Sequence, residues 1–136
     1  PTFHGIPLVG IADHYDPNPK RIRLKDDKTG RKKWDKKRAD DTGQLTMYCL
    51  MLWLIERIEP QDIDLRIDWM PTHYEDGKIA FIPGTEGREV DIHSFKTKRT
   101  KRDILEYGRY IITMRDEMIA YAKERPILDT SDPKEW

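Results

Sequence analysis

A turn-rich segment separates two runs of residues that each predict a β-strand with an aspartate near its end. The first run is 3–13, which allows a bend at Gly5 or Pro7, and the second is 21–29. Side chains alternate between the two faces of a strand, so Ile22, Leu24, Asp26 and Lys28 share one face of the second run. We therefore expect a buried sheet face that opens onto Asp26 and Lys28, with Asp27 pointing away.

The aspartates of the two runs, together with Lys28, form a set suited to metal-assisted phosphodiester hydrolysis. Asp13 and Asp26 can hold one hard divalent cation and leave positions for water and phosphate. Such a cation acidifies its bound water, and a neighbouring ammonium orients the nucleophile or stabilises the pentacoordinate phosphate. The alternative is a salt-bridged surface hairpin, because Asp-x-Lys is common by chance in a chain that is 37% charged.

Composition limits the classes of protein that this chain can belong to. Its 136 residues predict one domain. Basic and acidic residues are equal in number, 25 each, so the net charge does not indicate nucleic-acid binding, and only a local basic patch could do so. The single cysteine, Cys49, excludes an internal disulfide framework and an iron–sulfur cluster within these residues. The longest apolar run, 47–55, is too short to cross a membrane, and no secretory signal opens the chain. We expect a cytoplasmic protein with no membrane partner.

Two basic clusters predict contacts with nucleic acid. The segment 20–38 holds eleven basic residues against three acidic ones, and its loop 31–38 also contains Trp34, which can stack on a base or cover the core. The second cluster is 96–102. A solvated loop is the alternative for such charge runs. The residues predicted to bind nucleic acid are Lys32, Lys33, Trp34, Lys36, Lys37, Arg38, Lys98 and Arg99.

The remaining pattern predicts alternating helices and strands. A helix from about Thr42 to Ile58 is apolar nearly all round, which is typical of a buried helix. Gln44 and Tyr48 lie on one face near its N-terminus and can act together, although an exposed glutamine and a core tyrosine would have the same spacing. We expect strands at 63–69, 79–82 and 90–95, a hairpin turn at 75–78, a helix at 102–124 with its apolar side buried, and a loosely ordered tail at 126–136.

Three motifs in order resemble those of the PD-(D/E)XK nucleases, specifically the RecB-like exonuclease branch. They are Gly-x-x-Asp at 10–13, Asp-x-Lys-Thr-Gly at 26–30 and Gln-x-x-x-Tyr at 44–48, all within about the first 50 residues. The resemblance implies a single α/β domain over 1–136, with a mixed β-sheet core flanked by helices in the restriction-endonuclease-like fold. It also implies a Mg²⁺- or Mn²⁺-dependent deoxyribonuclease that hydrolyses DNA phosphodiester bonds. The resemblance favours an exonuclease, and the sequence leaves an endonuclease open.

The resemblance also assigns roles to the motif residues. Asp13, Asp26 and the backbone carbonyl of Asp27 would hold the metal, Lys28 would be the catalytic lysine, and Gln44 and Tyr48 would help place the DNA strand. Members of this family usually carry an earlier helix with a further Glu or His, and only Pro1 and Thr2 precede the first predicted strand here. The alternative is a non-catalytic nucleic-acid-binding or assembly domain that keeps the nuclease fold within a larger DNA-processing machine.

Overall fold

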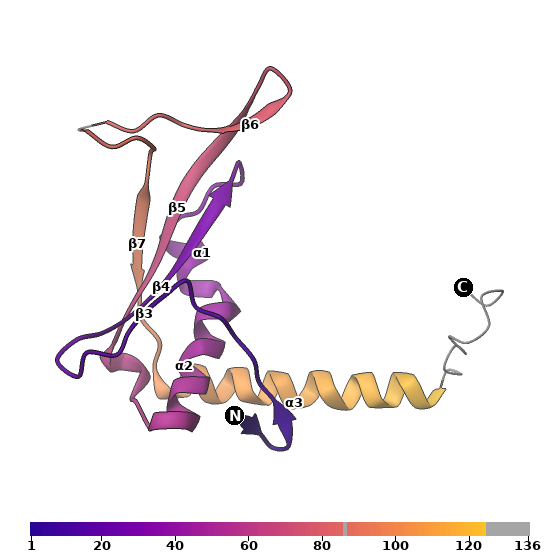
Figure 1. The fold of residues 1–136 in the computed structure, drawn as a ribbon. Helices are drawn as coiled ribbons and strands as arrows, with labels where there is room; N and C mark the ends of the chain where they lie inside the picture. Colours follow the sequence, from indigo (N-terminus) through magenta and orange to yellow (C-terminus); the bar gives the residue numbers. More distant parts are fainter. Residues whose placement is uncertain (86, 125–136) are drawn as a thin grey trace.

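Strand β5 is the centre of a curled mixed sheet with helices packed against it, so the protein has an α/β fold (Figure 1). The computed structural model describes residues 1–85 and 87–124. Strand β5 pairs with β4 in parallel and with β6 and β7 antiparallel, and β3 pairs antiparallel with β4. The elements are β1 (Thr2–Phe3), β2 (Ile6–Pro7), β3 (His14–Asp16), β4 (Ile22–Gly30), α1 (Lys36–Asp41), α2 (Gly43–Glu56), a 3₁₀ turn η1 (Pro60–Asp62), β5 (Ile63–Glu75), β6 (Lys78–Phe81), β7 (His93–Thr97) and α3 (Lys101–Glu124).

The alternation predicted for the second strand is confirmed. The register of β4 and β5 runs from Ile22 beside Ile63 to Gly30 beside Pro71. Leu24 and Asp26 are buried on the face that β4 shares with the buried side chains of β5, and Arg23 is exposed on the other. This register extends the buried face of the sheet up to Asp26.

Helix α2 supplies most of the core that covers this face. It begins at Gly43 and ends at Glu56, close to the predicted bounds. Leu45, Cys49 and Leu50 are fully buried in one cluster with Leu65 and Ile67 of β5. Each aliphatic side chain of this kind contributes about 1.5–3 kcal/mol when it is removed from water. Because α2 is fixed along the sheet in this way, the side chains of its first turns face the end of β4.

The first predicted strand, 3–13, is wrong. Strands β1 and β2 form a small hairpin of their own, and His4 and Gly5 take positive φ values of 49° and 78° in its turn. Residues 8–13 then run outside any strand, and Val9 and Ile11 are 81% and 84% exposed. Only His14–Asp16 pairs with β4. An apolar run forms a strand only where it pairs with a neighbouring strand, and residues 8–13 form no ladder with any of the described strands.

Three other boundaries differ markedly from those predicted. The strand expected at 63–69 continues to Glu75. The basic loop 31–38 ends early, because Asp35 caps the short helix α1 by accepting a hydrogen bond from the Arg38 amide at 2.7 Å. Strand β7 begins at His93 instead of residue 90, and Val90 makes only an isolated bridge to Pro83. The predicted hairpin turn between β5 and β6 is confirmed.

The prediction that helix α3 buries its whole apolar side is wrong. Ile104 and Gly108 are buried, and a Cβ at Gly108 would lie 2.5 Å from the ring of Phe3. Farther along, Met118 is 66% exposed, and the helix extends away from the sheet (Figure 1). Within the described ranges, no helix has the length and apolar character needed to span a membrane. The predicted tail, 126–136, lies outside the described residues.

Candidate active site

Asp26 and Lys28 lie together near the end of β4, on the face covered by α2. Asp26 is only 3% exposed, and its Oδ2 atom lies 2.5 Å from Nζ of Lys28. Lys28 is held from the other side by Gln44, whose Oε1 accepts a hydrogen bond from Nζ at 2.6 Å. A buried carboxylate and a half-buried ammonium therefore form a fixed pair at the edge of the core.

Asp13 reaches the same end of β4 from the segment that precedes β3. Its Oδ2 accepts a hydrogen bond from the backbone N–H of Asp27 at 2.8 Å. The N–H and C=O of a strand residue face the same neighbour, so the Asp27 carbonyl also faces the edge where Asp13 lies. The Asp27 side chain is on the opposite face, where it pairs with His14 at 2.9 Å. The structure thus brings Asp13, Asp26, Lys28 and the Asp27 backbone together.

The two carboxyl groups have pKa values shifted in opposite directions. Burial raises the pKa of Asp26 above its ordinary 3.8; the nearby Lys28 opposes this shift, and Asp13 adds to it. The hydrogen bond from the Asp27 amide lowers the pKa of Asp13, and a hydrogen bond from the Asp26 carboxyl acts in the same direction. Two adjacent carboxylates without a cation repel, and this pair relieves the repulsion by favouring the proton on Asp26.

These oxygen atoms fit a hard divalent cation. Among the residues that the structure describes, Lys28 is the ion-pair partner of the buried Oδ2 of Asp26, with Nζ 2.5 Å away, and this oxygen accepts no further hydrogen bond. Residues 1–85 and 87–124 contain no group of three or more His, Cys, Asp or Glu side chains that could together hold a metal ion. Mg²⁺ needs fewer, because it keeps several waters and is commonly bound by one or two carboxylates. Asp13, Asp26 and the Asp27 carbonyl could hold it.

We expect Asp26→Asn to leave the melting temperature of the metal-free protein at pH 7 unchanged or higher. A folded-state pKa above the ordinary 3.8 means that folding favours the protonated carboxyl, so stability is lost as pH rises through the folded pKa. Asparagine carries no charge at any pH. The difference between variant and wild type should shrink as pH falls below 3.8, as measured by thermal unfolding across pH. A variant less stable than wild type at pH 7 would contradict this expectation.

Gln44 and Tyr48 lie where the four-residue spacing placed them, on one face of α2 toward β4. The Gln44 amide donates to the Tyr48 hydroxyl at 2.9 Å, and this hydroxyl donates to the Ile11 carbonyl at 2.8 Å. Tyr48 is 6% exposed. Gln44 therefore joins the Asp26–Lys28 pair directly, and Tyr48 joins it through Gln44.

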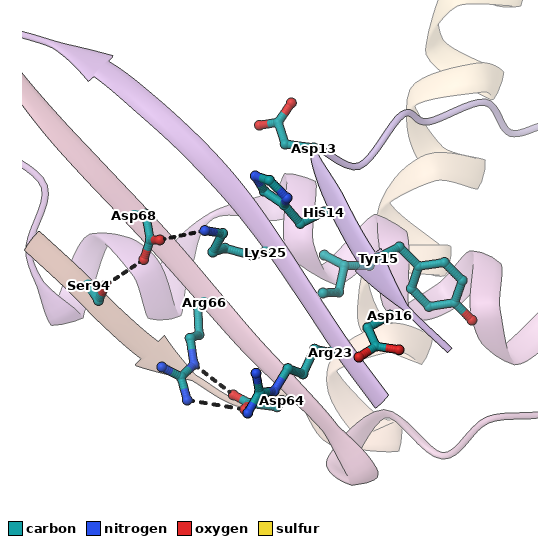
Figure 2. A pocket seen from close by; sticks show the side chains of 11 residues that line it. Asp13, His14, Tyr15, Asp16, Arg23, Lys25, Asp64, Arg66, Asp68 and Ser94 are labelled. Atoms are coloured by element: carbon teal, nitrogen blue, oxygen red, sulfur yellow. Dashed lines mark hydrogen bonds and ion pairs between the residues drawn. The ribbon is translucent and has the colours of Figure 1, made fainter. Parts of the chain in front are cut away.

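The opposite face of the sheet carries a groove of about 560 Å³ lined by charged side chains (Figure 2). In this groove Asp68 lies between Lys25, at 2.8 Å, and Ser94, at 2.6 Å. Asp64 forms ion pairs with both Arg21, at 2.9 Å, and Arg66, at 3.2 Å. These charges largely neutralise one another, and the groove meets the candidate site only at Asp13.

The first basic cluster follows directly from the site. Lys32, Lys33, Lys36 and Lys37 are exposed. Trp34 is 7% exposed and belongs to the core, with the Arg38 guanidinium 3.8 Å and Lys28 Nζ 5.7 Å from its ring centroid. Of the two alternatives for Trp34, stacking on a base or covering the core, the structure shows the second. Arg38 is half buried on this ring and donates to the Lys33 carbonyl at 3.0 Å, so it shapes the loop.

The second basic cluster does not present all of its charges. Lys98 is exposed, but Arg99 is 3% exposed, which removes it from the predicted nucleic-acid-binding surface. Its guanidinium donates to the carbonyls of Ala39 and Thr42 at 2.9 and 3.0 Å. It also donates to Thr46 and Thr97, both at 2.7 Å, and to the Lys98 carbonyl at 3.0 Å. All five N–H donors are thus used to join α1, α2 and β7.

Some contacts around the site have no clear local signal in the sequence. Arg31 lies over the ring of Tyr74, 5.4 Å from its centroid, and links the basic loop to the β5–β6 hairpin. His14 pairs with Asp27 only because β3 and β4 are antiparallel. Neither contact can be predicted until the pairing of the strands is known.

The sequence matches no protein-family model, and neither a curated protein nor a solved structure is significantly similar to this chain.

Proposed function

We propose that this protein is a metal-dependent nuclease that hydrolyses DNA phosphodiester bonds, an exonuclease of the RecB-like branch with a restriction-endonuclease-like fold. The observation that carries the proposal is the meeting of Asp13, Asp26 and Lys28 at one end of β4. A strand pairing that differs from the predicted one still delivers both carboxylates and the ammonium to one point. The mixed sheet with α2 against it supports the same interpretation.

The residues of the site have complementary roles in the proposed reaction. Asp13 and Asp26 supply the negative charge that holds Mg²⁺ or Mn²⁺, and such a cation acidifies a bound water and neutralises charge on the phosphoryl oxygens. Cation binding would favour the ionised form of Asp26, whose pKa is raised in the free protein. With a cation on Asp26, Lys28 would pair less closely with that carboxylate and could hold the attacking water or a phosphate oxygen.

The exposed lysines of the basic loop and α1 are placed to hold the DNA backbone. Residues 31–42 connect Lys28 at the end of β4 to Gln44 at the start of α2, so this basic segment borders the site at both of its ends. Its lysines present their charges to solvent. Contacts of this type bind phosphates without reading bases.

Neutralising three of these lysines should weaken DNA binding and make it less sensitive to salt. For Lys32, Lys33 and Lys37 replaced together by glutamine, we expect the slope of log K against log salt to fall by about 0.9 for each duplex phosphate that is no longer bound, or about 0.7 for single strands. Fluorescence anisotropy at several salt concentrations measures this slope. A control that removes three exposed charges elsewhere, at Lys78, Arg109 and Lys123, should leave it nearly unchanged. Equal slopes in the wild type and the loop variant would favour a solvated loop.

The deciding experiment is degradation of end-labelled DNA, with and without Mg²⁺ or Mn²⁺. Wild type should cleave only with metal, and Asp26→Asn should be inactive although it is folded. Asp27→Asn should retain most activity, because its side chain lies on the other face of the sheet. Binding of DNA by wild type without cleavage in either metal would replace the enzyme hypothesis with that of a non-catalytic DNA-binding domain.

A further inference from the structure

Hydrogen bonds join the segment that carries Asp13 to Lys28 by two routes, which together form a closed ring. On the first route, Lys28 donates to Gln44, Gln44 donates to Tyr48, and Tyr48 donates to the carbonyl of Ile11, at 2.6, 2.9 and 2.8 Å. Ile11 is two residues before Asp13. This route therefore connects the ammonium to the start of the segment 11–13 through side chains of α2.

The second route passes through the backbone of β4. Asp13 accepts from the N–H of Asp27 at 2.8 Å, and Asp27 is the covalent neighbour of Lys28. Each end of the segment 11–13 is therefore anchored, one end by α2 and the other by β4. In such a ring the position of the Asp13 carboxylate relative to the Lys28 ammonium is set by both anchors.

The segment 11–13 follows Leu8, which is buried in the core, and leads into β3, which pairs with β4. The contacts with Tyr48 and Asp27 fix the short stretch between these two supports. Residues 8–13 belong to no strand, and Val9 and Ile11 expose their apolar side chains. Tyr48 contacts the segment twice. Its hydroxyl donates to the Ile11 carbonyl, and its ring packs so closely on Gly10 that a Cβ there would lie 2.7 Å from Cε1.

The hydroxyl of Tyr48 is already used in this ring. A tyrosine has one O–H to donate, and here the Ile11 carbonyl takes it. The Tyr48 side chain is also buried, with 6% of its surface exposed, and it lies against Gly10 and Ile11. A DNA phosphate could accept this hydrogen bond only if Ile11, and with it Asp13, moved away.

We infer that Tyr48 is a positioning residue, which with Gln44 holds the Asp13 carboxylate and the Lys28 ammonium in register and makes no contact with DNA. The inference rests on the proposed function, which it deepens, because it separates the residues that act on the phosphate from those that hold them. It differs from the DNA-placing role that the family resemblance implies for Gln44 and Tyr48.

The first test needs neither metal nor DNA. Tyr48→Phe keeps the ring on Gly10 and removes only the hydroxyl. The variant loses two hydrogen bonds, the one that Gln44 donates to the hydroxyl and the one that the hydroxyl donates to Ile11. We expect hydrogen exchange at the Asp27 amide to become roughly 3- to 10-fold faster, because its acceptor Asp13 is then less firmly held. The Leu24 amide, in the strand registered with β5, should keep its rate. Exchange measured by NMR distinguishes this local loosening from global destabilisation, which would speed both amides.

The second test uses kinetics. In Tyr48→Phe we expect kcat for DNA cleavage to fall about 10-fold or more while KM for DNA changes less than about 2-fold, since a misplaced Asp13 affects the reacting atoms and not substrate binding. Tyr110→Phe removes an exposed hydroxyl on α3 and should change neither value.

The outcomes separate the inference from the proposed function. An unchanged Asp27 exchange rate, or a raised KM with unchanged kcat, would overturn the positioning role and leave the nuclease proposal standing. Absence of cleavage by wild type would overturn the nuclease proposal. In that case the Asp27 exchange rate would still show whether Tyr48 positions Asp13.

Discussion

Replacing Lys28 with methionine should lower the rate of DNA cleavage by about 10²- to 10³-fold at saturating DNA and metal. Methionine keeps an aliphatic stem of similar length and removes only the ammonium. In the free protein this ammonium lies between Asp26 and Gln44, so it is already fixed next to the position where charge would develop on a phosphate. Its contribution should therefore appear mainly in kcat, because it strengthens in the transition state.

The measurement is single-turnover degradation of end-labelled DNA with Mn²⁺, beside a DNA-binding titration. Binding of DNA should change far less than turnover. Lys25→Met is a matched control, because Lys25 lies in the same strand on the opposite face, paired with Asp68. If Lys25→Met and Lys28→Met slow cleavage equally, the slower rate reflects damage to β4 and the assigned role of Lys28 is wrong.

The largest decrease in stability should come from Arg99→Met. This change leaves buried acceptors in α1, α2 and β7 without the donor that joins them. Each buried acceptor left unpaired costs roughly 1–3 kcal/mol, so we expect the free energy of unfolding to fall by at least about 3 kcal/mol. Urea denaturation followed by circular dichroism measures it.

Two variants sharpen this expectation. Lys98→Met removes the neighbouring exposed charge and should change stability by about 0.5 kcal/mol or less. Arg99→Lys should be intermediate, because an ammonium offers three donors where the guanidinium offers five in a planar array. An Arg99→Met variant within about 1 kcal/mol of wild type would mean that water or rearranged side chains satisfy these acceptors.

Local periodicity was sufficient for the parts of the site that lie within one element. Alternation along β4 placed Asp26 and Lys28 on the core side, and the four-residue spacing placed Gln44 beside Tyr48. The position of Asp13 could not be obtained in this way, because the segment 8–13 is held by a tyrosine hydroxyl and a backbone amide far along the chain. Its apolar residues suggested a strand, but this segment forms no ladder with any of the described strands.

The burial of Arg99 and the exposure of much of α3 could not be predicted from the sequence either. A charged residue in a basic run is normally exposed, and only the meeting of three separate elements gives Arg99 enough acceptors to be buried. The 3.6-residue period of α3 indicates that one side of the helix is apolar. It does not indicate how much of that side is covered by the rest of the chain. Burial of such residues depends on tertiary contacts that a local pattern does not contain.

The partial packing of α3 has a consequence for the local stability of the helix. The helix has 24 residues, and its buried residues, Ile104 and Gly108, both lie in its first third. Helical segments without tertiary packing are only marginally stable in water, so the free energy needed to open the backbone should decline from the packed end toward Glu124. The first turns then share the stability of the core, whereas the last turns depend on local helix propensity and side-chain pairs. We therefore expect the two ends of this one helix to open with different free energies.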